Sequence, residues 1–214
     1  MSEQKTLVVI GGGAAGFFCA VNAARMQPSL RVIIVEKTSK VLQKVKVSGG
    51  GRCNVTHALF EIPELSRRYP RGQSFLKKSL HWFSPKDTLA WFAERGVTIH
   101  EKADGRMFPD TNSSQTIIDC LLREANQYGV ALQLNCDVQH IKHVNGQFHL
   151  ETAGSRTLTA DFLCIATGGY PKATQFGWLT ETGHTIAPPV PSLFTFNVID
   201  KKITTLMGLA VEQA

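Results

Sequence analysis

Two glycine-rich segments have the residue types and spacing to bind the phosphate groups of a nucleotide. In the first, Gly11, Gly13 and Gly16 form the pattern GxGxxG. Glycines at this spacing allow a tight turn, let a pyrophosphate approach the backbone, and let the next helix pack closely on its strand. Ala14 and Ala15 lie inside this motif, just before the helix predicted for residues 17–27. A helix N-terminus offers free N–H groups and a partial positive charge, so we include both residues in the predicted phosphate site.

An acidic residue follows at the distance where a dinucleotide fold holds a ribose. Glu36 comes 20 residues after Gly16, near the end of a β-branched run. A carboxylate there accepts hydrogen bonds from ribose hydroxyls and repels a 2′-phosphate. We place Lys37, the next residue, in the same site. FAD and NAD both contain adenosine diphosphate, so this segment alone leaves the choice of cofactor open.

The second segment, SGGGRCN, puts a cation directly after three glycines. It ends a stretch, residues 37–60, that holds several lysines and no acidic residue. Such a run is usually a solvated basic face, but here it ends in a turn whose N–H groups can form an anion-binding nest. We predict that this turn contacts the far side of a diphosphate, which a simple NAD domain does not need. The predicted residues are Ser48, Gly49, Gly50, Arg52, Cys53 and Asn54.

Cys53 has two interpretations. A thiol beside a flavin would have its pKa lowered by the adjacent Arg52. A buried, inert thiol is the interpretation we favour. No motif specifies an acid, a base or a nucleophile, so the catalytic residues stay unknown.

The surrounding sequence has the periodicity of an α/β fold. Residues 6–10 and 31–37 read as buried strands, and residues 17–27 read as a helix that ends before Pro28, which makes a βαβ unit. Ser84 and Ser113 are predicted helix N-caps. Residues 97–109 predict a hairpin. Residues 131–160 predict a strand and an antiparallel meander that turns at Asn145–Gly146, and residues 161–169 return to the parallel sheet. Trp82, Trp91 and Phe92 are expected in the core.

Composition limits the class of protein. The chain has 214 residues, 43% hydrophobic and 19% charged, and a formal net charge of +6. Five cysteines without a CxxC pair indicate reduced thiols in a cytoplasmic protein.

His140 and His143 are three apart in a predicted strand and point to opposite faces, so we expect no metal site. The uncharged stretch from Thr6 to Ala24 is too rich in glycine for a membrane span, and we expect no membrane association.

Five stretches together resemble a known family. They are VVIGGGAAG, SGGGRCNVT, GRMFP, IATGG and GHTIAPPVPSL, and they span nearly the whole chain. The sequence is similar to the BaiN/RdsA-type NAD(P)/FAD-dependent oxidoreductases, also called the aminoacetone oxidase family. The resemblance implies a Rossmann-like fold of the two-dinucleotide-binding flavoprotein type, with a mostly parallel sheet, a small β-meander and noncovalent FAD. It adds Val138, near the adenine, and Thr167, Gly168 and Gly169 to the predicted site.

The resemblance also implies hydride transfer from a donor such as NAD(P)H to a small-molecule substrate. Two alternatives stay open: a truncated nucleotide-binding module without turnover, and an RNA-modifying flavoprotein. The support for RNA is five basic residues, which a solvated surface explains equally well, so we do not favour a nucleic-acid partner. They are Arg67, Arg68, Arg71, Lys77 and Lys78.

Members of the family run to roughly double this length, and we expect this chain to lack their C-terminal half. Residues 1–187 would form an incomplete FAD-binding domain, and residues 188–214 would begin an inserted β-rich domain. Pro191–Ile199 alternates like a half-buried strand, and Leu206–Val211 looks like a second such piece. We expect the chain from about Pro188 onward to be mobile or to associate with another copy through its strand edge.

Overall fold

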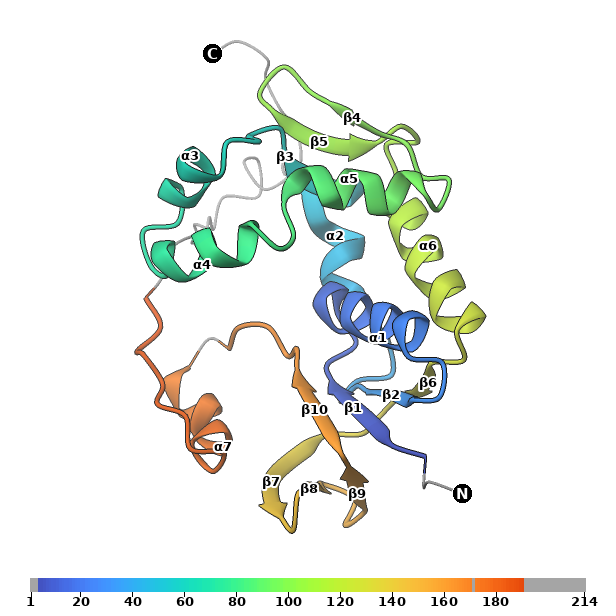
Figure 1. The fold of residues 1–214 in the computed structure, drawn as a ribbon, viewed down its shortest axis with the longest axis vertical. Coiled ribbons are helices and arrows are strands. Elements are labelled where there is room, and N and C mark those ends of the chain that lie inside the picture. The colour runs from blue at the N-terminus through green and yellow to red at the C-terminus, as the bar shows by residue number, and fades with distance from the viewer. Residues whose placement is uncertain (1–3, 171, 191–214) are drawn as a thin grey trace, which may run out of the picture. The chain divides into compact units, whose positions relative to one another are not determined.

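A parallel sheet of four strands organises the part of the chain that carries the glycine-rich motifs. The computed structural model describes residues 4–170 and 172–190. The strand order is β10-β1-β2-β6, with every neighbouring pair parallel. The strands are β1 Thr6–Ile10, β2 Arg31–Val35, β6 Ala131–Gln133 and β10 Phe162–Ile165 (Figure 1). This topology confirms the predicted α/β fold.

Helix α1 (Ala14–Met26) packs on one face of this sheet, and α6 (Ser114–Gln127) packs against α1. Alternate strand residues such as Val9 and Ile34 join Phe17 of α1 in one hydrophobic cluster. Residues on the other face, such as Val8, are also buried. Burial on both faces is the usual state of a parallel sheet and explains why β1 and β2 are almost entirely β-branched or aliphatic.

The second face is next to an antiparallel meander of three strands, which Figure 1 shows on the side of the sheet away from α1. These strands are β7 Val138–Val144, β8 Gln147–Thr152 and β9 Thr157–Ala160. Its turn lies at Asn145–Gly146, where both residues have positive φ, as a two-residue hairpin requires. The predicted meander and its turn are therefore confirmed.

The other elements connect or flank these layers. Asp104 and Gly105 lie in the turn of a hairpin that also pairs with a short third strand, as the sequence predicted for residues 97–109. The elements are α2 Gln43–Gly51, β3 Thr56–His57, α3 Ile62–Arg67, α4 Gln73–Leu80, α5 Pro85–Ala93, β4 Ile99–Glu101 and β5 Arg106–Pro109.

Both predicted N-caps are present. The Ser84 hydroxyl accepts from the Asp87 N–H and the Asp87 carboxylate accepts from the Ser84 N–H, a complete capping box. Ser113 caps α6 through its hydroxyl, which accepts from the Gln115 N–H. Trp91 is buried with its ring edge-on to that of Phe92, as predicted.

The prediction that Trp82 lies in the core is wrong, because its side chain is 84% exposed. Trp82 follows α4, a helix with no buried residue. Its neighbour Phe83 is less exposed, at 38%, and its ring lies edge-on to that of Phe18 with 5.0 Å between the ring centres. Aromatic composition alone does not tell which of two adjacent rings faces the interior.

The chain divides into two compact units, Met1–Gly168 and Gly169–Ala214. The described part of the second unit contains a 3₁₀ turn, Ala173–Phe176, and a short helix, α7 Gly177–Thr180. The predicted boundary between residues 187 and 188 stays a prediction. The predicted strands at Pro191–Ile199 and Leu206–Val211 lie outside the described residues. Within the described residues, no helix has the length and apolar character needed to cross a membrane.

Candidate cofactor site

The carboxyl ends of β1, β2 and β10 meet at the first glycine turn. The Gly11 N–H donates to the Val35 carbonyl at 2.8 Å, which ties the end of β1 to β2. On the other side, the Ala166 N–H donates to the Ile10 carbonyl at 2.8 Å. In open α/β sheets, ligands bind at this edge, where successive strands diverge. The edge contains the first turn, Glu36 and the segment after β10.

Gly13 and Gly16 have opposite surroundings, although both belong to the same motif. A Cβ at Gly16 would collide with the Gly11 carbonyl oxygen, so only glycine allows this approach of α1 to the turn. A Cβ at Gly13 would meet no atom within 4 Å. The side of the turn at Gly13 is therefore open, and a side chain there would fill the space in front of the helix.

The N-terminus of α1 faces this open space with its own donors. The first hydrogen bond of the helix runs from the Phe17 N–H to the Gly13 carbonyl at 3.0 Å. The N–H groups of Ala14, Ala15 and Gly16 precede that bond in the helix, as the first donors of any helix do. They add a partial positive charge suited to a phosphate.

Glu36 is half-buried at the end of β2, and its carboxylate accepts three hydrogen bonds from the protein. Its Oε2 accepts from the Gly12 N–H at 2.8 Å. Its Oε1 accepts from the N–H and the hydroxyl of Thr38, each at 2.9 Å. The carboxylate is thus held beside the first glycine turn, and Lys37 follows it on the surface.

The segment between β6 and β7 lies next to Glu36. The Cys136 N–H donates to the Glu36 carbonyl at 2.9 Å, and the Asn135 N–H donates to the Thr38 carbonyl at 3.1 Å. Val138 is the first residue of β7 and is buried. These contacts bring the start of the meander close to Glu36, and the place of Val138 at an adenine stays a prediction.

The segment after β10 approaches the first turn from the other side. A Cβ at Gly11 would lie only 2.5 Å from the Ala166 carbonyl oxygen, so the two chains touch here. Thr167 and Gly168 follow directly, with Gly168 at a φ of +70°. Gly169 begins the second unit.

Lys44 extends from α2 toward this segment. Its Nζ would lie 3.5 Å from a Cβ at Gly168. The sequence showed Lys44 only as one of several lysines in a basic run, so this cation was missed as a site residue. The signal that could have found it is its position four residues before Ser48, one helical turn ahead of the second glycine turn.

The second glycine turn interrupts α2. The backbone leaves helical geometry at Ser48, and Gly49 and Gly50 both have positive φ, 56° and 67°. The Cys53 N–H closes the turn by donating to the Ser48 carbonyl at 2.8 Å. Successive N–H groups in a turn conformation can form the anion-binding concavity of a nest. The sequence predicted this turn but not the helical residues before it.

Arg52 and Asn54 connect the second turn to β5. The guanidinium of Arg52 lies over the ring of Phe108, 4.7 Å from its centre, and its Nε donates to the Gly49 carbonyl at 3.1 Å. The Asn54 Oδ1 accepts from the Met107 N–H at 3.2 Å. A Cβ at Gly49 would lie 2.8 Å from the Phe108 ring, so the turn is packed against this strand.

Cys53 agrees with the interpretation as a buried thiol. It is 7% exposed, and burial raises its pKa, while a hydrogen bond with Ser48 opposes that rise. A different pair of thiols interacts between α1 and β10. The hydrogen bond between Cys19 and Cys164 raises the pKa of Cys19 and lowers that of Cys164 to about 7.

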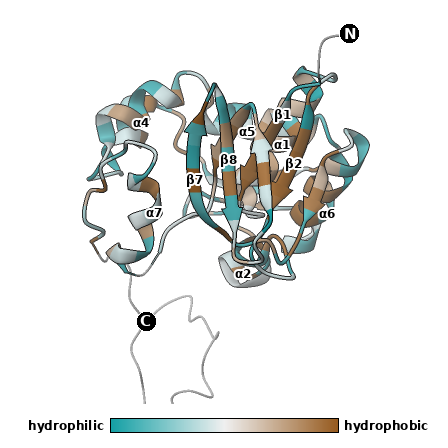
Figure 2. Cartoon of the chain, turned by 90° about the horizontal axis from the view of Figure 1, so that it is seen from below, coloured by the Kyte–Doolittle hydropathy of each residue, from teal (hydrophilic) through white to brown (hydrophobic). Residues whose placement is uncertain are grey.

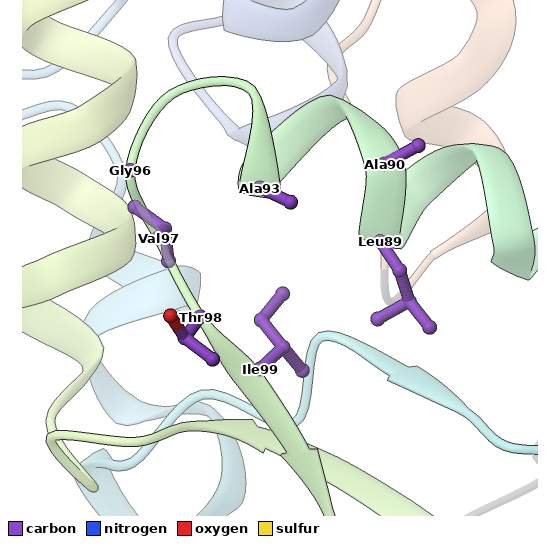
Figure 3. A pocket seen from close by; sticks show the side chains of 7 residues that line it. All are labelled: Leu89, Ala90, Ala93, Gly96, Val97, Thr98 and Ile99. Carbon is purple, nitrogen blue, oxygen red and sulfur yellow. The ribbon is translucent and has the colours of Figure 1, made fainter.

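A hollow of about 330 Å³ lies elsewhere, between α5 and β4 (Figure 3). Its lining is mostly aliphatic and includes no residue of the predicted site: Leu89, Ala90, Ala93, Gly96, Val97, Thr98 and Ile99. Among residues 4–170 and 172–190, no three His, Cys, Asp or Glu side chains are grouped so that they could hold a metal ion.

Comparisons with known proteins agree with this geometry. The HI0933-like protein Rossmann domain matches residues 5–213. The chain is 31% identical over 223 residues to the ribosomal RNA dihydrouridine synthase of Haemophilus influenzae, across 99% of this chain and 54% of the relative. It is 27% identical to the 3-dehydro-bile acid delta(4,6)-reductase of Clostridium scindens, across 95% of this chain and 53% of the relative. The chain thus spans about half the length of these curated relatives.

Two solved structures share the fold. The 3-ketosteroid-delta4-(5alpha)-dehydrogenase from Rhodococcus jostii superposes with a TM-score of 0.55 at 15% identity, over 83% of this chain and 49% of that chain. THI4 from Thermovibrio ammonificans superposes with a TM-score of 0.52 at 15% identity, over 77% of this chain and 57% of that chain. The family match covers nearly every residue that builds the sheet and both glycine turns. This chain therefore belongs to the HI0933-like family of FAD-dependent Rossmann-domain proteins.

Proposed function

We propose that this chain is the FAD-binding part of an oxidoreductase that adds hydrogen to a carbon–carbon double bond, with a reduced nicotinamide as donor. The observation that carries the proposal is the open position at Gly13, next to the N-terminus of α1 and the carboxylate of Glu36. An adenosine diphosphate needs donors for its phosphates and an acceptor for its ribose, and this edge of the sheet offers both.

In this proposal each group of residues has a separate task. The N–H groups at the start of α1 bind the pyrophosphate, and Glu36 accepts from the adenosine ribose. Lys44 and Arg52 supply positive charge on the side of the second glycine turn. Thr167 and Gly168 border the site beyond β10. When FAD is bound, its isoalloxazine supplies the hydride chemistry.

For the substrate, we propose RNA ahead of a small molecule, which reverses the order that the sequence favoured. Two relatives at 31% identity, from Haemophilus influenzae and Escherichia coli, are ribosomal RNA dihydrouridine synthases by name. A dihydrouridine is a uridine with hydrogen added across a double bond. The bile acid reductase is the relative that keeps a small molecule as the second candidate.

The test is a titration of the purified 214-residue chain with FAD, followed by absorbance and by quenching of flavin fluorescence. We expect saturable binding, and bleaching of the bound flavin by NADH or NADPH without air. Saturable binding without bleaching would indicate a nucleotide-binding module without turnover. A folded chain that does not bind FAD would refute the proposal.

Comparing FAD with riboflavin distinguishes contacts to the phosphates from contacts to the flavin ring, because riboflavin lacks the diphosphate. Lys44→Ala and Arg52→Ala should each weaken FAD binding more than riboflavin binding. Arg25→Ala is the matched control, since it removes an exposed cation from the end of α1, away from the turn. Equal losses for both ligands would show that Lys44 and Arg52 do not act on the phosphates.

A further inference from the structure

Helices α3 and α4 carry an unusual concentration of positive charge. Between Leu65 and Lys86 the chain has six Lys and Arg residues and no Asp or Glu. The whole chain has 23 Lys and Arg against 17 Asp and Glu, so without these six the remaining charges would balance. The segment thus carries as many uncompensated positive charges as the net charge of the whole chain, and a local charge of this kind attracts a polyanion.

The same segment exposes aromatic rings. Phe75 is 75% exposed and Trp82 is 84% exposed. They are seven residues apart, about two helical turns, with Lys78 between them. The Trp82 N–H donates to the Ser79 carbonyl at 2.9 Å, so the chain still follows a helical path there. The two rings and one cation consequently share a side of α4.

This exposed side is fixed to the rest of the unit at both ends. The Phe83 ring packs against that of Phe18 on α1. Leu65 and Ser66 of α3 are buried, and α3 packs on α4. Figure 2 shows α4 carrying both hydrophilic and hydrophobic residues. The rings are thus displayed by an ordered helix.

We propose that this α3–α4 surface, made of Arg67, Arg68, Phe75, Lys77, Lys78 and Trp82, binds single-stranded RNA. The cations would contact phosphates, and the rings of Phe75 and Trp82 would stack on unpaired bases. Two relatives with ribosomal RNA in their names support RNA as the polyanion. A membrane-binding helix separates its apolar face from its charges. Here Lys78 lies between the rings, which favours bases over lipid.

This surface deepens the proposed function by naming how its substrate is held, and it rests on that function only for the choice of RNA. Binding of RNA and binding of FAD are measured separately. A chain that binds FAD but not RNA would refute the α3–α4 surface alone. A chain that binds RNA but not FAD would refute the flavin function alone.

The experiment measures the anisotropy of a labelled oligouridylate of about 16 nucleotides, the upper end of single-strand site sizes. The chain is added with and without FAD, over a range of salt. Trp82→Ala should weaken binding by about fivefold or more. Met26→Ala is its matched control, because Met26 is 74% exposed at the end of α1. Lys78→Ala should lower the slope of log affinity against log salt by about 0.7, and Arg25→Ala, also in the last turn of a helix, should change it less.

Three results would overturn the proposal. The first is an affinity of Trp82→Ala equal to that of Met26→Ala. The second is equal binding of oligouridylate and an RNA duplex of the same length, since a duplex hides its base faces. The third is a change of oligomeric state in Trp82→Ala without loss of RNA affinity, which would make the surface a contact between copies. Circular dichroism and FAD titration of each variant show that the fold is retained.

Discussion

Two glycines of the first turn meet different requirements: Gly16 serves the packing of the fold, and Gly13 serves the proposed ligand. Gly16 is needed by the fold, because its α-carbon faces the Gly11 carbonyl oxygen at a distance that leaves no room for a side chain. Gly13 faces open space and has extended backbone angles that alanine adopts easily. The space in front of Gly13 is where we propose that the pyrophosphate binds.

Gly13→Ala and Gly16→Ala should therefore differ in what they damage. Gly13→Ala should change the free energy of unfolding by no more than about 1 kcal/mol and weaken FAD binding by about tenfold or more. Gly16→Ala should destabilise the chain by about 1–3 kcal/mol through overpacking. Urea unfolding and FAD titration measure the two effects. Undiminished FAD binding by Gly13→Ala would contradict the position assigned to the pyrophosphate.

Glu36→Ala should weaken FAD binding by roughly 1–3 kcal/mol, the cost of leaving a buried hydrogen-bonding group unpaired. Riboflavin binding should change little, because riboflavin has no adenosine. Isothermal titration with both ligands tests this. Equal affinities of Glu36→Ala and the unaltered chain for FAD would remove Glu36 from the site. Because Glu36 also accepts from Gly12 and Thr38, the stability of the variant is measured alongside.

Among single residues, the sequence predicted those whose positions are set by a local spacing pattern. The spacing of the first glycines and of Glu36 repeats a known backbone geometry, so their place at the sheet edge followed directly. The contact of Arg52 with Phe108 joins residues 56 positions apart, and no spacing rule connects them. Lys44 was missed for a similar reason, since its approach to Gly168 depends on how α2 packs.

Among the elements, a buried ion pair joins the turn after α5 to α6. The Arg95 Nε donates to the Glu124 carboxylate at 2.7 Å, and both side chains are 7% exposed. The Arg95 guanidinium also lies 3.8 Å from the centre of the Trp91 ring. Neither residue stood out in the sequence, because a charged residue in a helix is usually solvated.

Glu124→Ala should destabilise the chain by about 3–5 kcal/mol, since it leaves the buried Arg95 charge without its buried partner. Glu94→Ala is the control, because Glu94 also pairs with Arg95 but is largely exposed. Thermal and urea unfolding measure both variants. A loss for Glu124→Ala no larger than that for Glu94→Ala would mean that Arg95 reaches solvent.

Asp161 joins β1 and β10 and makes their pairing sensitive to pH. The Thr6 N–H donates to its carboxylate at 2.8 Å, and this bond holds the pKa of Asp161 below its ordinary value. A lowered folded pKa stabilises the chain above the unfolded pKa, and the effect is lost as the pH falls through the folded pKa. Asp161→Asn should thus be less stable at neutral pH, with a difference that shrinks below about pH 4. A difference independent of pH in urea unfolding would contradict this role.

Elements with strong local signals were predicted well. The serine caps and the Asn145–Gly146 turn act through neighbouring residues, so their positions follow from the sequence. The break in α2 and the exposure of Trp82 depend on the packing of distant segments. These were the features that the sequence did not reveal.

For the molecule as a whole, binding FAD should raise the stability of the entire cooperative unit. The proposed site draws on β1, β2, α1 and residues 166–168, which belong to one compact unit. FAD at about 100 times its Kd should add about 2.7 kcal/mol to the free energy of unfolding. Differential scanning fluorimetry should show Tm rising with FAD concentration. A Tm that riboflavin raises as much as FAD would indicate that the phosphates are not held.

The thiol pair between α1 and β10 offers an intrinsic chemical reporter. Burial raises the pKa of Cys53, Cys120 and Cys136, whereas the hydrogen bond from Cys19 lowers that of Cys164. At neutral pH an alkylating reagent should therefore react first at Cys164, on the strand that borders the first glycine turn. The rate of this labelling, followed by mass spectrometry, would report how often β10 opens, without any engineered probe.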